Sequence, residues 1–185
     1  MFLMIISYDM ETTGLNRTDD DILQLSIVDE HGNTLFNEMF KPTQKTEWPD
    51  ASAVHGITPE KVRDLPTFDK WRSEIQSIFD NSSLLVGYNQ LSFDDPFLTA
   101  NGICVDSSKS VDVMLTFSEF YGETNTHPEG FNKTPYKWKK LSQAADFFGY
   151  DWGVDHAHDS LADAKAAMFV YRNLVELQDY LNLKS

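Results

Sequence analysis

The sequence is poor in cysteine and in basic residues. Its 185 residues include one cysteine, Cys104, which excludes an intrachain disulfide framework and any zinc site built on paired cysteines. This usage favours a reducing compartment, such as the cytoplasm. Only 15 lysines and arginines stand against 29 aspartates and glutamates, which gives a net charge of −14. A protein that binds nucleic acid through a general basic surface is therefore not expected.

The sequence also lacks long apolar runs and flexible linkers. The apolar opening, residues 1–6, is too short to span a membrane, and it has neither the basic start nor the cleavage site of a signal peptide. We expect no membrane partner. With 41% hydrophobic residues, the chain is too apolar for a disordered acidic tail. Its length suits a single domain over residues 1–185.

Hydrophobic periodicity predicts a mixed α/β fold. Three strands come first, over residues 1–9, 22–29 and 34–41, and a turn around Gly32 joins the last two. Helices and short strands then alternate: helix starts at Thr58 and Thr67, a strand over 84–88, a helix over 95–101, a strand-to-helix passage over 111–122, and helices over 141–148 and 161–181. This order predicts a mixed sheet, antiparallel at first and then parallel, flanked by helices.

Residues 122–137 form the one long stretch without a strong period. A connection of this length is typical of a functional or mobile loop. A tolerated surface insertion explains it equally well.

Carboxylates stand at the ends of several predicted elements. Asp9 and Glu11 follow the first strand, and we expect them to project side by side because residues i and i+2 of a strand share a face. Asp94 follows the strand over 84–88, and Asp163 lies one turn inside the last helix among small and apolar neighbours. Taken singly, each has a simpler explanation as a polar strand end or a helix N-terminus.

Together, these four acids can converge as hard oxygen ligands for Mg²⁺ or Mn²⁺. Two such ions roughly 4 Å apart promote in-line attack on a phosphodiester, because one activates the water and the other stabilises the leaving 3′-oxygen. His158 precedes Asp163 by five residues and is the candidate general base, since a helix N-terminus favours the neutral imidazole. His156 is a competing candidate, and either histidine could be purely structural.

Four segments together resemble a known family. Asp9-x-Glu11-Thr-Thr-Gly-Leu15, Asn89-x-x-x-Phe93-Asp94 and His158-x-x-x-x-Asp163 look like the three exonuclease motifs of the DEDDh, or DnaQ-like, group. This group includes the proofreading epsilon subunit of bacterial replicative polymerases. The segment Val-His-Gly-Ile-Thr over residues 54–58 is similar to a fourth family segment. Each motif is moderately specific alone, and the order of all four over residues 5–174 carries the resemblance.

The resemblance implies a ribonuclease-H-like fold and 3′-to-5′ hydrolysis that releases nucleoside 5′-monophosphates. It implies that two divalent cations, Mg²⁺ or Mn²⁺, are held by Asp9, Glu11, Asp94 and Asp163, with His158 as general base. The tyrosine variant of the family is excluded because Asp159 stands where the tyrosine would be. The positions that match nucleotide-binding residues are Thr12, Thr13, Leu15, His55, Asn89 and Phe93. A base can stack on Leu15 or Phe93, although Phe93 suits the core equally well.

The sequence departs from the family pattern at two places. Tyr88 replaces a histidine often found before Asn89, and Asp159-Ser160 replaces a more usual Arg-Ala. The missing arginine leaves less positive charge near the scissile phosphate, which puts rate and substrate preference in doubt. Neither departure removes a predicted metal ligand or the base.

One local segment is both basic and aromatic. It comprises Lys133, Lys137, Lys139 and Lys140, interleaved with Phe131, Tyr136 and Trp138. Such a segment could guide a single strand to the site, and solvated lysines on an exposed approach are the simpler alternative. No segment resembles a polymerase-docking tail, which favours a stand-alone enzyme or a small accessory subunit. A polymerase or another nucleic-acid-processing protein is the partner class to consider.

The leading prediction is a metal-dependent 3′-to-5′ exonuclease that acts on DNA 3′ ends, with single-stranded or frayed ends favoured. The motifs do not separate it from an RNA-trimming or oligoribonuclease-like enzyme, because acceptance of a terminal 2′-hydroxyl depends on pocket shape. A nucleic-acid-binding module without catalysis would lack an acid or the base, and all five are present. A ribonuclease-H-type endonuclease is disfavoured by the spacing of His158 and Asp163.

Overall fold

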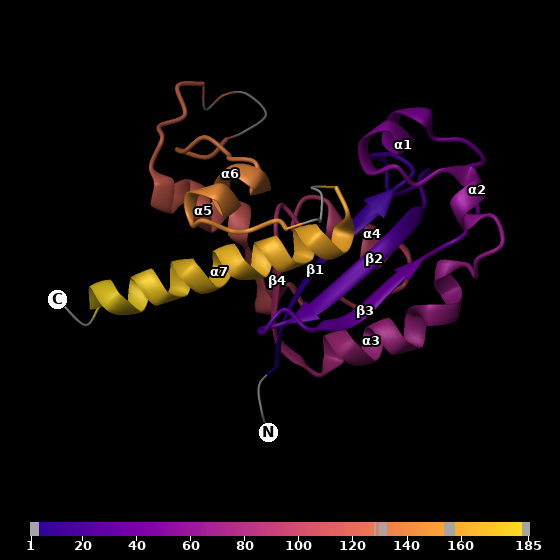
Figure 1. Ribbon diagram of the computed structural model, residues 1–185, viewed down its shortest axis with the longest axis horizontal. Coiled ribbons are helices and arrows are strands. Elements are labelled where there is room, and N and C mark those ends of the chain that lie inside the picture. Colours follow the sequence, from indigo (N-terminus) through magenta and orange to yellow (C-terminus); the bar gives the residue numbers. More distant parts are fainter. Residues whose placement is uncertain (1–3, 128, 130–132, 154–157, 183–185) are drawn as a thin grey trace.

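A five-stranded mixed sheet forms the centre of the protein (Figure 1). The structure, a computed structural model, describes residues 4–127, 129, 133–153 and 158–182. The strand order is β3-β2-β1-β4-β5, in which β1 pairs antiparallel with β2 and parallel with β4. The strands are β1 (Met4–Thr12), β2 (Ile22–Asp29), β3 (Thr34–Met39), β4 (Ser82–Gly87) and β5 (Ser110–Asp112). The predicted mixed sheet is confirmed.

The central strand is longer than its apolar pattern predicted. The sequence predicted an end at Asp9, but β1 continues to Thr12 because it stays paired with β2, with Asp9 opposite Ser26 and Glu11 opposite Gln24. Its pairing with β4, by contrast, covers only Met4–Ser7. The end of β1 that carries both acids therefore runs on beyond β4.

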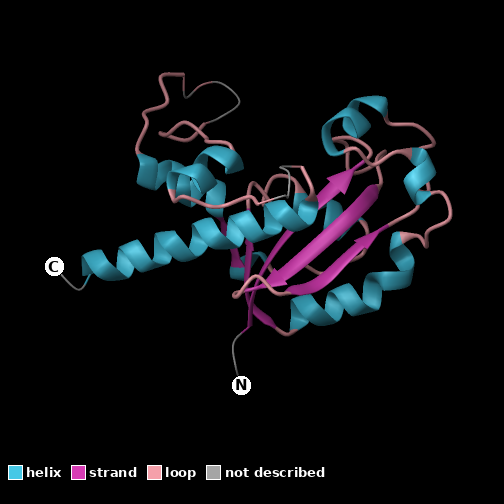
Figure 2. Cartoon of the chain, viewed as in Figure 1, coloured by secondary structure: helices cyan, strands magenta, loops and turns pink. Residues whose placement is uncertain are grey.

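Helices cover both faces of this sheet (Figure 2). On one face, the even-numbered β1 residues Ile6, Tyr8 and Met10 belong to a core with residues of α3 (Arg72–Asp80) and α4 (Asp94–Ala100). On the other, α7 (Ser160–Asn182) packs with α5 (Val113–Tyr121) and α6 (Leu141–Phe147) through small residues such as Ala164 and Ala166. None of the helices in the described ranges is long and apolar enough to cross a membrane.

One helix was not predicted. Helix α1 (Pro49–His55) has no buried residue, so it shows no apolar period, and the short α2 (Pro59–Val62) follows it. The available signal lay at its ends: a proline at the first position and Gly56, whose φ of 69° is left-handed. Helix α1 lies near the end of β1 in Figure 1. The sequence also placed the end of β3 two residues late, at residue 41 instead of Met39.

The two ends of the long stretch without a period pair with each other. Thr124 bridges Tyr136, the N–H of Lys137 donates to the carbonyl of Glu123 at 2.8 Å, and that of Asn125 donates to Pro135 at 2.9 Å. We call residues 123–137 the arm.

Two short 3-10 turns precede regular elements. The turn Phe68–Trp71 precedes α3, where the sequence predicted a helix from Thr67, and the turn Ser107–Lys109 precedes β5.

Candidate active site

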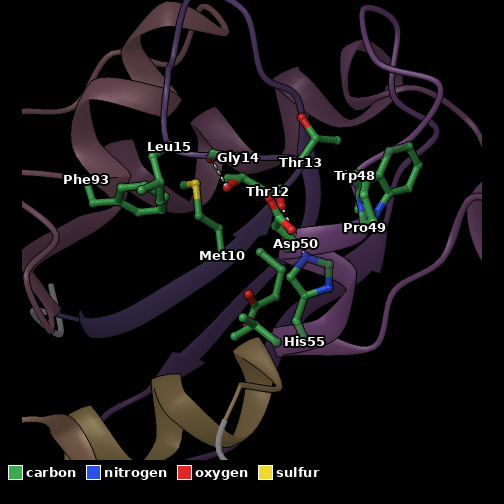
Figure 3. Close-up of a pocket in the computed structure, with 13 residues that line it drawn as sticks. Met10, Thr12, Thr13, Gly14, Leu15, Trp48, Pro49, Asp50, His55 and Phe93 are labelled. Atoms are coloured by element: carbon green, nitrogen blue, oxygen red, sulfur yellow. Dashed lines mark hydrogen bonds between the residues drawn. The ribbon is translucent and has the colours of Figure 1, made fainter.

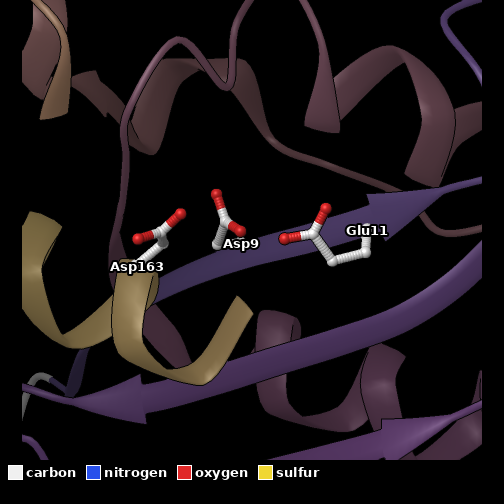
Figure 4. Close-up of side chains that lie close together, drawn as sticks. All are labelled: Asp9, Glu11 and Asp163. Atoms are coloured by element: carbon white, nitrogen blue, oxygen red, sulfur yellow. The ribbon is translucent and has the colours of Figure 1, made fainter. Parts of the chain in front are cut away.

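Three of the four predicted metal ligands meet at the end of β1. Oxygens of Asp9, Glu11 and Asp163 all lie within 4.8 Å of one another, with Asp9 between the other two (Figure 4). Asp9 and Glu11 project from the same face of β1 because they are alternate residues. Asp163 comes from the first turn of α7, which lies against that face. Asp94, the first residue of α4, is 3% exposed and lies outside the group that meets within 4.8 Å.

Burial and mutual repulsion raise the pKa values of these acids. Burial raises the pKa of Asp9 well above its ordinary value, and the negative charges of Asp94 and Asp163 raise it further. Burial, with the charges of Asp163 and Asp94, raises the pKa of Glu11 to about 8. The pKa of Asp94 is also raised to about 8, first by burial and then by Asp95. Without a counter-cation, the cluster retains protons near neutral pH.

The cluster fits divalent cations. Oδ1 of Asp94 and Oδ1 of Asp163 are buried and have no hydrogen-bond partner in the described part of the chain. A buried carboxylate oxygen without a partner is costly, which makes such atoms exceptions that require a cause. Carboxylate oxygens are the ligands that Mg²⁺ and Mn²⁺ prefer. The donor set thus suits the cations that the resemblance implies.

His158 lies just before α7, and its side chain is exposed. Its backbone has a left-handed φ of 72°, and its N–H donates to Oδ2 of Asp163 at 3.1 Å. This bond holds the backbone of His158 beside the carboxylate of Asp163. His156 lies outside the described residues.

A pocket of about 480 Å³ opens beside the acids (Figure 3). Leu15 and Phe93 lie on one side of it, and Trp48 and Pro49 of the α1 region lie on the other. Glu11 also lines it, which makes the pocket continuous with the acid cluster. Five of the six predicted nucleotide-binding residues line it, namely Thr12, Thr13, Leu15, His55 and Phe93, whereas Asn89 does not.

Sequence reasoning predicted His55 but missed the rest of the α1 wall of the pocket. Its lining residues there are Trp48, Pro49, Asp50, Ala51 and Val54. The proline and glycine at the ends of α1 could have indicated the helix, but no local pattern indicates that it faces the end of β1.

Both ring nitrogens of His55 are engaged with backbone groups. Nδ1 accepts the N–H of Ile57 at 3.0 Å, so Nε2 carries the proton and donates to the carbonyl of Thr12 at 3.2 Å. Partial burial lowers the pKa of His55, which keeps this neutral tautomer. The ring therefore fastens the end of α1 to the end of β1. Nε1 of Trp48 completes the wall by donating to the carbonyl of Ile57 at 2.7 Å.

Two further acids, Asp20 and Asp21, are buried and well hydrogen-bonded and do not belong to the cluster. Asp20 accepts the hydroxyl of Thr13 at 3.1 Å and the N–H of Asn16 at 3.0 Å. Its carboxylate fills the space beside Gly14, where an added Cβ would come within 2.5 Å of it. Asp21 accepts the hydroxyl of Thr43 and three backbone N–H groups from residues 43–45, all at 2.9–3.0 Å.

The structure limits how much free positive charge the predicted basic guiding segment can offer, and its guiding role stays a prediction. Lys137 and Lys139 both form ion pairs with Glu123, at 2.7 Å in the case of Lys137. These two partners lower the pKa of Glu123 to about 2, and Nζ of Lys139 also lies 4.5 Å from the centre of the Tyr121 ring. Lys133 and Lys140 are exposed, whereas Phe131 lies outside the described residues. Two of the four positive charges are thus committed within the protein.

The chain has relatives among known proteins. The RNase_T exonuclease family matches residues 6–171. The chain belongs to this family. The exonuclease is 31% identical to the uncharacterized exonuclease CP81 of Escherichia phage 186, over 88% of this chain and 84% of that protein. It is 26% identical to the DNA polymerase III subunit epsilon of Pasteurella multocida (strain Pm70), over 90% and 66% of the two chains.

Solved structures share the fold. Exonuclease I of E. coli in complex with a dA16 oligonucleotide superposes with a TM-score of 0.71 at 21% identity, covering 97% of this chain and 43% of that one. The Pan2 catalytic unit of Neurospora crassa gives 0.69 at 16% identity, covering 98% and 28%. The exonuclease thus spans less than half the length of these two chains. The predicted ribonuclease-H-like fold and the predicted 3′-to-5′ exonuclease class are confirmed.

Proposed function

We propose that this exonuclease removes nucleotides from the 3′ end of DNA, at single-stranded or frayed ends, and releases nucleoside 5′-monophosphates. The observation that carries the proposal is the pocket of about 480 Å³ whose wall includes Glu11 of the acid cluster. A terminal nucleotide in this pocket places its 5′-phosphate, the group to be cut, beside the acids. The relatives named DNA polymerase III subunit epsilon and the oligonucleotide in the exonuclease I complex support DNA as the substrate.

Asp9, Glu11, Asp94 and Asp163 would hold two divalent cations, Mg²⁺ or Mn²⁺. Bound there, the cations supply positive charge to the phosphate and lower the pKa of water. The four side chains contribute by their placement: two on the strand at the centre of the sheet and two at helix starts. Their raised pKa values mean that cation binding displaces protons.

His158 is the proposed general base. An imidazole nitrogen takes a proton from the attacking water as the water oxygen bonds to phosphorus and the bond from phosphorus to the 3′-oxygen breaks. The shortened strand keeps that 3′-oxygen, and the phosphate leaves with the released nucleotide. The exposed side chain can meet water, while the bond to Asp163 holds the backbone of His158 in place.

The nucleotide-binding roles follow the pocket. Leu15 is 87% exposed in the free protein, so a base that stacks between it and Phe93 buries apolar surface on both residues. Thr12 and Thr13 line the same pocket at the end of β1 and are proposed to contact the terminal nucleotide there. His55 acts by fixing the α1 wall, since backbone groups already occupy both of its nitrogens. Asn89 is proposed to act from outside the pocket lining.

Digestion of matched DNA and RNA oligonucleotides, single- and double-stranded and blocked at either end, tests the proposal. We expect 5′-mononucleotides from unblocked 3′ ends of DNA, and no release in EDTA or with Asp9→Ala. Release from the 5′ end, internal fragments, or activity that persists in both EDTA and Asp9→Ala would contradict it.

Trimming of RNA 3′ ends is the second candidate. It is favoured by a 25% identity to the RNA exonuclease 4 of Debaryomyces hansenii over 90% of this chain. The RNA arm of the same experiment decides between the two, because the matched strands differ chiefly in the 2′-hydroxyl of the sugar. The epsilon-subunit relatives make a polymerase the partner class to test by co-purification.

A further inference from the structure

The turn between β4 and α4 leads directly to Asp94, and its backbone is unusual. Asn89 has a φ of 66°, in the left-handed region that residues other than glycine rarely adopt. Such a conformation persists only where the surroundings hold it in place. The turn also folds tightly onto β4, since a Cβ added to Gly87 would lie 2.8 Å from Cβ of Gln90.

Asp112 at the end of β5 holds this turn. It is 5% exposed, and its Oδ1 accepts the N–H of Asn89 at 2.9 Å and the N–H of Met114 at 3.0 Å. A second bond from the same region supports the turn: Nε2 of the fully buried Gln90 donates to the carbonyl of Val111 at 2.8 Å. The last residues of β5 are thus joined to the turn through a carboxylate and a carbonyl.

The bonds continue from Asn89 to the start of α4. The carbonyl of Asn89 accepts the N–H groups of Ser92 at 3.1 Å and Phe93 at 3.2 Å, and the carbonyl of Gln90 accepts the N–H of Asp95 at 2.9 Å. These bonds enclose Phe93, which lines the pocket, and Asp94, which faces the cluster. A shift of Asn89 would therefore move both residues.

We propose that Asp112 is a positioning residue of the exonuclease, which fixes the β4–α4 turn and thereby places Asp94 and Phe93. The inference rests on the proposed function, in which Asp94 is a metal ligand. Asp112 belongs to none of the four motif segments and does not line the pocket. It also caps α5 through Met114, but that capping role requires no bond to Asn89. The bond that Asp112 accepts from the N–H of Asn89 is what joins the helix cap to the site.

The test compares Asp112→Ala and Asp112→Asn with Asp106→Ala. Asp106 caps the 3-10 turn before β5 by accepting the N–H of Ser108 at 3.1 Å and is exposed, so it controls for the loss of a cap alone. The measurements are kcat and KM on a 3′-labelled single-stranded DNA oligonucleotide, the thermal midpoint, and the Mg²⁺ concentration that gives half of the maximal midpoint shift.

Asp112→Ala should lower kcat about tenfold or more, because small displacements of catalytic groups have effects of this size. It should also raise the half-maximal Mg²⁺ concentration severalfold. Asp112→Asn should be intermediate, since an amide oxygen can still accept the two bonds of Oδ1. Asp106→Ala should leave kcat, KM and the Mg²⁺ requirement unchanged.

If Asp112→Ala lowers only the thermal midpoint and leaves kcat and the Mg²⁺ requirement unchanged, Asp112 is a helix cap and the inference is wrong. If the alanine variant does not fold, Asp112→Asn decides, and unchanged kcat and Mg²⁺ requirement would again overturn it. The Mg²⁺ titration needs no substrate. It therefore still decides on Asp112 if the wild-type protein releases no nucleotides, an outcome that counts against the proposed function alone.

Discussion

Two groups of acids in this protein differ in how their carboxylate oxygens are hydrogen-bonded. The cluster acids Asp9, Glu11, Asp94 and Asp163 repel one another, and buried oxygens of two of them have no hydrogen-bond partner within the described residues. The supporting acids are buried as well but well bonded: Asp20, Asp21, Asp95 and Asp112. Asp94 and Asp95 adjoin in sequence, yet Asp95 accepts the hydroxyls of Tyr8 and Ser110 while Oδ1 of Asp94 has no partner. Among these acids of the described chain, the two with a buried carboxylate oxygen that lacks a partner, Asp94 and Asp163, both belong to the cluster.

The largest effect is expected from Asp9→Asn. This change should lower the rate of nucleotide release about a thousandfold or more, ~4 kcal/mol in the barrier, because it removes a charge that is proposed to hold the cations. It should also stabilise the metal-free protein by about 1 kcal/mol, since it relieves repulsion. Labelled-oligonucleotide digestion and urea unfolding in EDTA measure the two effects. A variant within tenfold of wild-type activity would show that the cluster is not the catalytic centre.

Removal of a supporting acid should destabilise the protein, whereas Asp9→Asn should stabilise its metal-free form. Asp21→Ala leaves four donors without their acceptor, and we expect it to destabilise the protein by about 3 kcal/mol in urea unfolding. The exposed Asp19 provides the control, and Asp19→Ala should change stability by less than about 0.5 kcal/mol. Equal effects of the two substitutions would mean that the bonds of Asp21 contribute nothing net.

The pH dependence of stability tests the raised pKa of a cluster acid without mutation. The pKa of Glu11 is raised from 4.5 to about 8, so the metal-free folded protein binds more protons than the unfolded chain between these values. Its free energy of unfolding should fall as pH rises from about 4.5 to about 8, by at least ~1.4 kcal/mol, the value of one pKa unit. Saturating Mg²⁺ should remove this decline. Thermal midpoints across the range, in EDTA and in Mg²⁺, give the comparison, and a flat EDTA profile would contradict the raised pKa values.

The smallest effect concerns the lysines of the arm and of the segment that follows it. Lys137→Glu with Lys140→Glu should weaken binding of single-stranded oligonucleotides about threefold at low salt and leave the fold intact. Most of the loss should come from Lys140, because Lys137 is already paired with Glu123. The single variants, compared by fluorescence anisotropy, separate the two contributions. Unchanged affinity in the double variant would reject any guiding role.

Local patterns predicted the parts of the fold whose environment is uniform. Strand β2 is buried almost throughout and was predicted residue for residue, and α7 was predicted to within a residue at each end. Helix α1 was missed because it buries nothing, and β1 was cut short because its polar end is held by β2. Contacts between distant residues decide such cases, and a window along the sequence does not contain them.

The site divides in the same way. Motif spacing indicated the four cluster acids, three of which the structure brings within 4.8 Å of one another, and the six residues proposed to bind the nucleotide, five of which line the pocket. It did not indicate the rest of the α1 wall, the pairing of Lys137 with Glu123, or the bond from Asp112 to Asn89. The last two join residues 14 and 23 positions apart. Each depends on the folded chain, and neither pair lies within a single motif.

The placement of the cluster acids has a consequence for the order in which the site would open. Asp9 and Glu11 belong to the middle strand of the sheet, whose amides we expect to exchange with solvent deuterium only when the core unfolds. Asp94 and Asp163 lie in the first turns of helices, where opening is local and more frequent. Amide exchange should thus be slow at the two strand acids and faster at the two helix-start acids. The loss of a cation should first increase exchange at the two helix starts.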